Sequence, residues 1–137
     1  MGGALGTTNG GANKIALRWD GAGKVFIGGS MQTTAPHYDA LLQINGKAVS
    51  KSFYVTIDNW ADYVFNDNYK AMPLDKLNDY VKANHHLPEV PSEEELKTNG
   101  LNVGEMDKIL MKKIEELTLY IIELKAEVNT LKEKTNK

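Results

Sequence analysis

The chain ends in an apolar repeat that constrains its fold more than any other feature. Within residues 104–137, alternating steps of four and three residues separate Leu110, Ile114, Leu117, Ile121, Leu124, Val128 and Leu131. A mean period of about 3.5 residues is typical of helices that wind into a left-handed coiled coil. A lone helix of this kind would expose leucine and isoleucine to water. The repeat therefore predicts an oligomer held together by these residues, which we call the seam.

The residue types in the seam bear on the number and direction of the helices. β-Branched residues occupy heptad positions a and leucines occupy positions d, a distribution that favours two parallel helices. The apolar surface nevertheless extends beyond a and d, and Glu127 at g can reach Lys132 at e of a parallel neighbour. We predict a parallel homotrimer, with a dimer as the alternative. The residues that widen the surface are Met111, Thr118, Leu119, Tyr120 and Ile122.

A second interpretation of the same repeat is an amphipathic helix that packs on its own globular domain. Four heptads span about 42 Å at about 1.5 Å per residue. This length is large for a domain of the size that the rest of the chain can form, so the oligomer is the preferred interpretation.

Composition excludes several classes of function. With 137 residues, 42% of them hydrophobic, the chain suffices for one modest domain and the helix. A net charge of −2 gives no cationic surface for nucleic acid. The absence of cysteine excludes disulfides, thiolate metal sites and thiol catalysis. No membrane span and no signal peptide are predicted, so we expect either export as part of a larger particle or a piece of a longer polypeptide.

The first part of the chain predicts short strands. A glycine-rich lead-in precedes an alternating run at 14–19, a turn at 20–23 and a second strand at 24–27. A further hairpin is expected from 40–44 and 47–50 around Asn45-Gly46, followed by an extended segment at 52–57. Such short strands bury little apolar surface within one chain. We therefore expect β elements that intertwine among subunits.

The middle of the chain predicts an aromatic connector and two short helices. Residues 58–65 are rich in aromatic side chains, which we expect to be buried: Trp60, Tyr63 and Phe65. Pro73 favours a helix start, with an end near Asn84. Ser92 and Glu95 form a capping box, and Gly100 favours a helix end.

Together these predictions give an α+β chain in three parts. Residues 1–57 form a glycine-rich β shaft or tip, residues 58–103 the connector with two short helices, and residues 104–137 the coiled-coil trimerisation helix.

Three ordered segments resemble a known class of proteins. NWADYVF at 59–65, KANHHLPEVPS at 82–92 and NGLNVGEMDKILMKKIEELTLYIIELK at 99–125 resemble the C-terminal region of tail-fibre-like and surface-exported proteins of Bacteroidota and their phages. The similarity covers about residues 50–125 and extends distantly to the intramolecular chaperone domains that end phage tail spikes and fibres. It implies a terminal trimerisation and folding module behind a β-rich shaft, in a virion tail or at a cell surface.

The chain departs from the self-cleaving members of that class. Those members begin the module with a Ser-Asp pair and an Arg-Leu-Lys stretch, whereas this chain has Ser50-Lys51-Ser52-Phe53. No acid directly follows either serine, and no nucleophile elbow surrounds them. We predict no catalytic residue and no enzyme, with an autoproteolytic chaperone as the alternative.

Other polar clusters have structural explanations. Adjacent His85 and His86 point in different directions on regular structure, so a metal site with Glu89 is not favoured. The acids at 93–95 suit a helix start, and the aspartates near residue 60 lack a calcium-loop pattern. No metal or cofactor is predicted.

The predicted partners are other copies of this chain and the rest of a larger fibre, virion or injection particle. A cell-surface glycan or receptor is a further expected partner. The aromatic residues best placed on the strand part for such contact are Trp19, Tyr38 and Tyr54.

Overall fold

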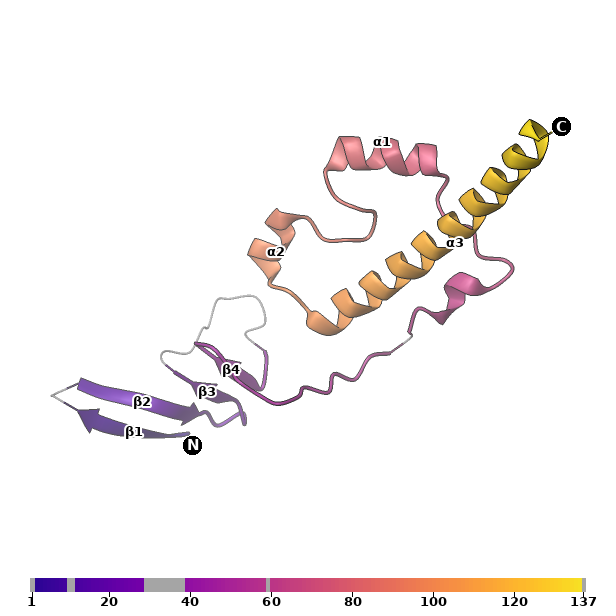
Figure 1. The fold of residues 1–137 in the computed structure, drawn as a ribbon. Coiled ribbons are helices and arrows are strands. Elements are labelled where there is room, and N and C mark those ends of the chain that lie inside the picture. The colour runs from indigo at the N-terminus through magenta and orange to yellow at the C-terminus, as the bar shows by residue number, and fades with distance from the viewer. Residues whose placement is uncertain (1, 10–11, 29–38, 59, 137) are drawn as a thin grey trace. The chain divides into compact units, whose positions relative to one another are not determined.

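The computed structural model describes residues 2–9, 12–28, 39–58 and 60–136 (Figure 1). The chain is α+β and divides into two compact units, residues 1–54 and 55–137. The first unit holds the strands and the second holds the helices.

The first unit is a four-stranded sheet in the order β1-β2-β3-β4. The strands are β1 (Gly3–Asn9), β2 (Ala12–Trp19), β3 (Val25–Ile27) and β4 (Leu42–Ile44). β1 and β3 both pair antiparallel with β2, and β4 pairs parallel with β3.

The predicted hairpin between β2 and β3 is confirmed, and Asp20 explains its turn. The Asp20 carboxylate accepts hydrogen bonds from the backbone N–H groups of Ala22 (2.9 Å) and Lys24 (3.0 Å). Gly23 adopts φ 83°, in the left-handed region that glycine enters without strain. The side chain thereby substitutes for turn hydrogen bonds that the backbone cannot make.

The structure defines the glycine-rich lead-in and corrects one prediction for this unit. The lead-in contains the strand β1, which pairs with the long β2 and has a register shift between Leu5 and Gly6. The predicted hairpin around Asn45-Gly46 is wrong, since β4 adds in parallel to β3 and residues 45–50 form no strand. The Asn45 N–H donates a hydrogen bond to the Ile27 carbonyl at the edge of β3 (2.8 Å). A local turn at Asn45-Gly46 would not satisfy this carbonyl.

Little apolar surface is buried in the first unit. Among the side chains described there, Phe26 in the short central strand is buried, whereas Leu5, Leu42 and Ile44 are exposed. A sheet with one buried aromatic residue gains little hydrophobic stabilisation. Contacts of the β part outside its own chain stay a prediction.

The second unit contains a 3-10 turn and three helices. These are η1 (Asp62–Phe65), α1 (Leu74–Asn84), α2 (Glu93–Asn99) and the 33-residue α3 (Val103–Thr135). The predicted boundaries are confirmed at Pro73, at the Ser92–Glu95 capping box and at Gly100. α1 ends where His85 takes the left-handed conformation with φ 60°.

The prediction of buried aromatic residues in the connector is wrong for the single chain. Trp60, Tyr63 and Phe65 are exposed, and the small side chains of Ala61 and Val64 are buried instead. η1 packs against α3, and a single 3-10 turn can direct only one narrow side toward that helix. The aromatic rings therefore lie at the edges of the contact.

Candidate oligomerisation surface

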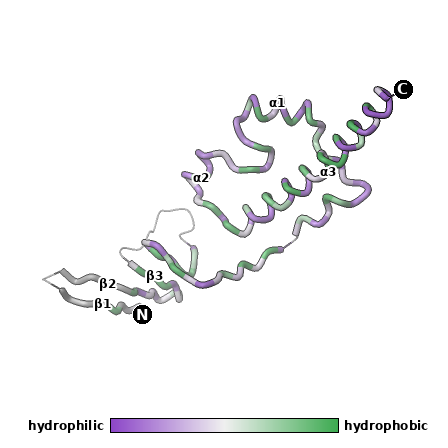
Figure 2. Tube along the Cα trace, in the orientation of Figure 1, coloured by the Kyte–Doolittle hydropathy of each residue, from purple (hydrophilic) through white to green (hydrophobic). Residues whose placement is uncertain are grey.

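The seam on α3 is exposed throughout its length. Its seven side chains retain between 42% (Val128) and 65% (Ile121) of their accessible surface. Figure 2 shows hydrophobic segments recurring among hydrophilic ones along α3. Every described residue from 121 to 136 is exposed, so the second half of the helix has no cover from its own chain. A stripe of this size on a soluble helix marks an interaction surface.

The first half of α3 also packs against its own chain. Gly104 is buried against Val55 and Ile57, where a Cβ atom would lie 2.8 Å from the Val55 side chain. Tyr120 is 8% exposed, and its hydroxyl donates a hydrogen bond to the Met72 carbonyl (2.6 Å). At about 100° per residue, Gly104 lies far from the seam, whereas Tyr120 occupies position g beside it. These intrachain contacts border the seam and leave its side chains exposed.

Glu89 links the loop between α1 and α2 to α3 by ion pairs. Its carboxylate lies 2.5 Å from Lys112 Nζ and 3.5 Å from Lys113 Nζ. Glu89 adopts φ 69°, a conformation that residues with a Cβ rarely take. The two lysines hold a strained residue in place.

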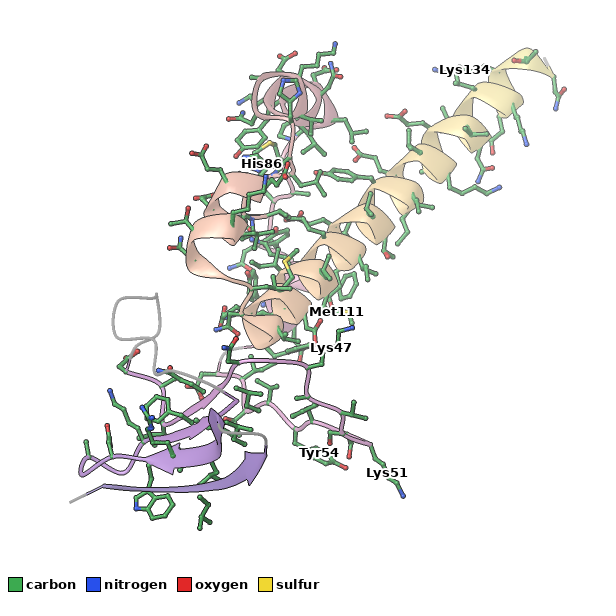
Figure 3. The ribbon with its side chains drawn as sticks, turned by 90° about the vertical axis from the view of Figure 1, so that its left-hand side faces the viewer. Lys47, Lys51, Tyr54, His86, Met111 and Lys134 are labelled. Carbon is green, nitrogen blue, oxygen red and sulfur yellow. The ribbon has the colours of Figure 1, made fainter. Side chains whose placement is uncertain are left out.

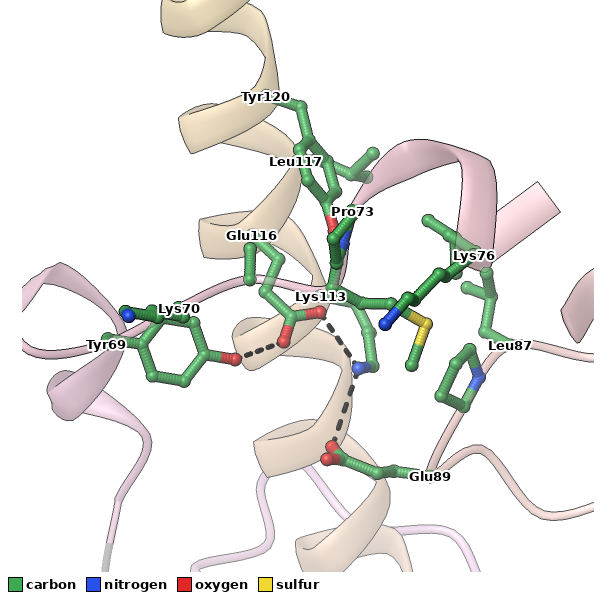
Figure 4. A pocket seen from close by; sticks show the side chains of 14 residues that line it. Tyr69, Lys70, Pro73, Lys76, Leu87, Glu89, Lys113, Glu116, Leu117 and Tyr120 are labelled. Atoms are coloured by element: carbon green, nitrogen blue, oxygen red, sulfur yellow. Dashed lines mark hydrogen bonds and ion pairs between the residues drawn. The ribbon is translucent and has the colours of Figure 1, made fainter. Parts of the chain in front are cut away.

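Two tyrosines of the connector extend this cluster. The Tyr69 hydroxyl donates to the Glu116 carboxylate, which also pairs with Lys113 Nζ at 2.9 Å. Lys112 Nζ lies 5.7 Å from the centre of the Tyr63 ring, close enough for a cation–π contact. Figure 4 shows Glu116 between Tyr69 and Lys113, with Glu89 on the far side of Lys113.

These contacts shift the pKa values of the cluster. Partial burial alone would raise the pKa of Glu89, but the Lys112 hydrogen bond and the charges of Lys113 and Lys112 outweigh it, so the pKa is lowered. Burial likewise opposes the charged form of Lys112, yet the bond and charge of Glu89 raise its pKa. Burial and the neighbouring Glu116 raise the pKa of Tyr69. All three groups thus keep their pairing forms near neutral pH.

The three segments that resemble fibre proteins meet in this unit. Tyr63 comes from the first segment, Glu89 from the second, and Lys112 and Lys113 from the third. Sequence reasoning did not find these pairs, because residues more than 20 positions apart carry no local signal of contact. It placed Tyr120 among residues widening the apolar surface, and Tyr120 instead packs toward its own connector.

Two grooves lie beside the seam. The first, of about 490 Å³, separates α1 and the loop at 87–89 from α3, and Leu117 of the seam forms part of its wall (Figure 4). The second, of about 540 Å³, lies between residues 71–75 and α3, and includes Leu124 of the seam. Both grooves continue directly into the exposed stripe.

The residues proposed for glycan or receptor contact do not form one site. Trp19 is partly exposed, but its ring covers Gly3 on the paired strand so closely that a Cβ there would not fit. Tyr54 is 97% exposed and projects away from the backbone (Figure 3). Tyr38 lies outside the described residues. Contact with a ligand stays a prediction.

The other polar candidates have local partners. The Ser50 hydroxyl donates to the Ser52 carbonyl (2.7 Å) in an exposed turn. The His86 ring lies edge-on to Tyr80, with 5.8 Å between ring centres. Glu95 completes the capping box of α2. Within the described ranges, no group of three histidine or acidic residues is placed to hold a metal ion.

Comparisons with protein families, with curated proteins and with solved structures found no match for this chain. Among the helices that the structure describes, none is long and apolar enough to cross a bilayer.

Tyr120 is expected to hold the connector on α3 mainly through its ring. Tyr120→Phe removes the hydrogen bond to Met72 and should lower the free energy of unfolding by about 1 kcal/mol. Tyr120→Ala also removes a buried ring and should lower it by about 3 kcal/mol or more. Urea unfolding at one fixed chain concentration measures both. Equal losses for the two variants would contradict the assigned packing of the ring.

The Glu89 ion pairs are expected to make stability depend on pH. Because the folded pKa of Glu89 lies below the unfolded value of about 4.3, its contribution is present above that pH and is lost as pH falls through the folded pKa. Glu89→Gln should therefore melt below the parent chain at about pH 7, and the difference should shrink as the pH falls below about 4.3. Glu133→Gln, at an exposed position of α3, is the control. A melting difference that persists in acid would contradict the ion-pair role.

Proposed function

We propose that this chain is a structural module that joins copies of itself through a parallel coiled coil of α3, as a homotrimer, with a dimer as the alternative. The exposed seam carries this proposal. Its residues lie on a 33-residue helix and remain exposed, although Tyr120 beside them packs on its own connector. Burying each leucine or isoleucine would contribute about 1.5–3 kcal/mol. Association is the direct way to remove such a stripe from water.

The same association would assist the folding of the β part. A coiled coil raises the local concentration of the attached segments and fixes their register. Non-local β pairing is slow because loop-closure entropy must be overcome first. The small core of the first unit, with Phe26 as its buried aromatic residue among the described side chains, is the kind of structure that would benefit.

The biological setting that we propose is the C-terminal end of a tail fibre or exported surface adhesin. The resemblance of three segments to such proteins supports it, and those segments meet around α3 rather than lying apart. In that setting the helix would join the subunits, and the connector would pack on its own helix.

The solution mass of the intact chain tests the proposal. We expect light scattering at micromolar concentration to give three times the chain mass of 15.2 kDa, or twice that mass for the alternative. A particle with the mass of one chain would contradict the proposal, because α3 would then remain exposed or fold against its own connector.

A further inference from the structure

Helix α1 carries an apolar stripe that its own chain covers only in part. Leu74, Leu77 and Val81 recur at spacings of three and four residues, which places them on one side of the helix. Leu74 is 45% exposed, and α1 contains no buried residue. No helix or strand in the described part of the chain packs closely against α1. A helix of 11 residues depends on packing for most of its stability, so we expect another surface to cover this stripe.

The start of α1 lies next to the seam on one defined side. In the second groove, Leu74 lies opposite Leu124 at position d and Glu127 at position g. In the first groove, Leu77 lies opposite Leu117 at d and Lys113 at g. The first turn of α1 therefore lies beside the g side of α3.

The surface that faces this side in a parallel coiled coil is the e side of the neighbouring helix. On α3, that side presents Thr118 and Lys125 at e and, next to them, Ile122 at b, which is 60% exposed. The second groove combines the apolar Met72, Pro73 and Leu74 with the carboxylates of Asp75, Glu123 and Glu127. An apolar and acidic groove thus meets an apolar and basic surface.

We infer that α1 of each subunit packs across the subunit boundary on the e side of α3 in the adjacent subunit, with Leu74 near Ile122. Lys125 of the adjacent subunit enters the groove lined by Asp75, Glu123 and Glu127. The inference rests on the proposed parallel oligomer and adds a second interface to the seam. Each subunit gives its α1 to one neighbour and receives α1 from another, or from the same neighbour in a dimer.

Disulfide trapping between single-cysteine chains tests this contact. Because the chain has no cysteine, a mixed disulfide between a Leu74→Cys chain and an Ile122→Cys chain joins two subunits by definition. The chains, one with a mass tag, are refolded together, oxidised mildly and analysed by mass spectrometry. A disulfide requires Cα atoms within about 7 Å, so it reports close packing.

The control pairs Leu74→Cys with Glu123→Cys. Glu123 lines the same groove as Leu74 in its own chain and hence lies on the wrong side of the neighbouring helix. We expect several-fold more mixed disulfide with Ile122→Cys than with Glu123→Cys. If the mixtures are oligomeric by light scattering but the two yields are equal, the α1 contact is overturned and the proposed oligomer stands. If the mixtures are monomeric, both are overturned.

A charge reversal tests the same contact without cysteine. Residues three and four positions from Lys125 on α3 are Ile121, Ile122, Val128 and Asn129, so no acid on its own helix pairs with it at those spacings. Lys125→Glu should lower the melting temperature at low salt, and about 1 M salt should remove most of the difference. Ala126→Glu, on the outer side of α3, should leave the melting temperature near that of the parent. Equal effects of the two variants would overturn the inference.

Discussion

We expect a chain in which asparagine replaces both Ile121 and Leu124 to be a monomer at concentrations where the parent chain is an oligomer. The two residues occupy successive a and d positions in the middle of the seam. Each replacement removes apolar surface from the interface and places an amide in a layer that cannot hydrate it, at a combined cost of about 3 kcal/mol or more. For both positions the loss is about 6 kcal/mol per chain, so the association constant falls by about four orders of magnitude for each chain in the oligomer.

Light scattering across a dilution series measures this effect. The control places asparagine at Ala126 and Thr130, which lie on the outer side of α3 and are exposed. Both variants carry two asparagines in the helix, so a difference in mass between them reports the seam and not helix propensity. A parent-like mass for the Ile121 and Leu124 variant would refute the assigned seam.

Ending the chain after Gly104 is expected to have the second large effect. The truncated chain loses the seam and also the surface against which the connector packs, including the partners of Met72, Glu89 and Tyr69. η1 also loses α3, the helix on which it packs and buries Ala61 and Val64. We expect a monomer with poor solubility and without a cooperative unfolding transition in the connector. Sedimentation and near-ultraviolet circular dichroism would measure these properties.

A smaller deletion separates the two roles of α3. A chain that ends after Tyr120 keeps the contacts of the first half of the helix but loses Ile121, Leu124, Val128 and Leu131 of the seam. We expect it to retain a folded connector and to associate far more weakly than the parent. A well-folded trimer from the chain that ends after Gly104 would show that assembly does not need α3.

The packing of Tyr120 changes how the width of the apolar surface is interpreted. The sequence offers Leu119 and Tyr120 as residues that extend the surface for a third helix. In the structure, Tyr120 is buried toward the Met72 carbonyl, and Leu119 lines the groove beside Pro73. Part of the surface therefore serves the chain's own connector. In the proposed oligomer, the number of subunits would then depend on the seam itself and on the remaining exposed residues beside it, such as Ile122.

The aromatic connector shows why some contacts escape prediction from sequence. The composition of residues 58–65 suggests burial of the largest side chains, but the structure buries Ala61 and Val64 and exposes the rings. Hydrophobicity gives the free energy available from burial and does not specify which side of a short segment faces its support. That choice depends on how the 3-10 turn approaches α3.

Sequence alone determined the features whose causes lie within a few residues. The seam follows from a periodic pattern, the starts of α1 and α2 follow from Pro73 and from the Ser92–Glu95 capping box, and the β2–β3 turn follows from Asp20. In each case the hydrogen-bond donor and acceptor, or the apolar residues of one helix face, are close neighbours in the chain. The local energy therefore favours one conformation strongly.

Only the tertiary structure decided which side of α3 the chain itself covers and which side remains for a partner. The deciding contacts join residues far apart, such as Tyr120 with Met72, 48 positions away, and Lys112 with Glu89, 23 positions away. It also placed β4 parallel to β3 rather than in a local hairpin. Such contacts form when whole elements reach a common geometry, because the gain from packing them must exceed the entropy of closing the intervening loops.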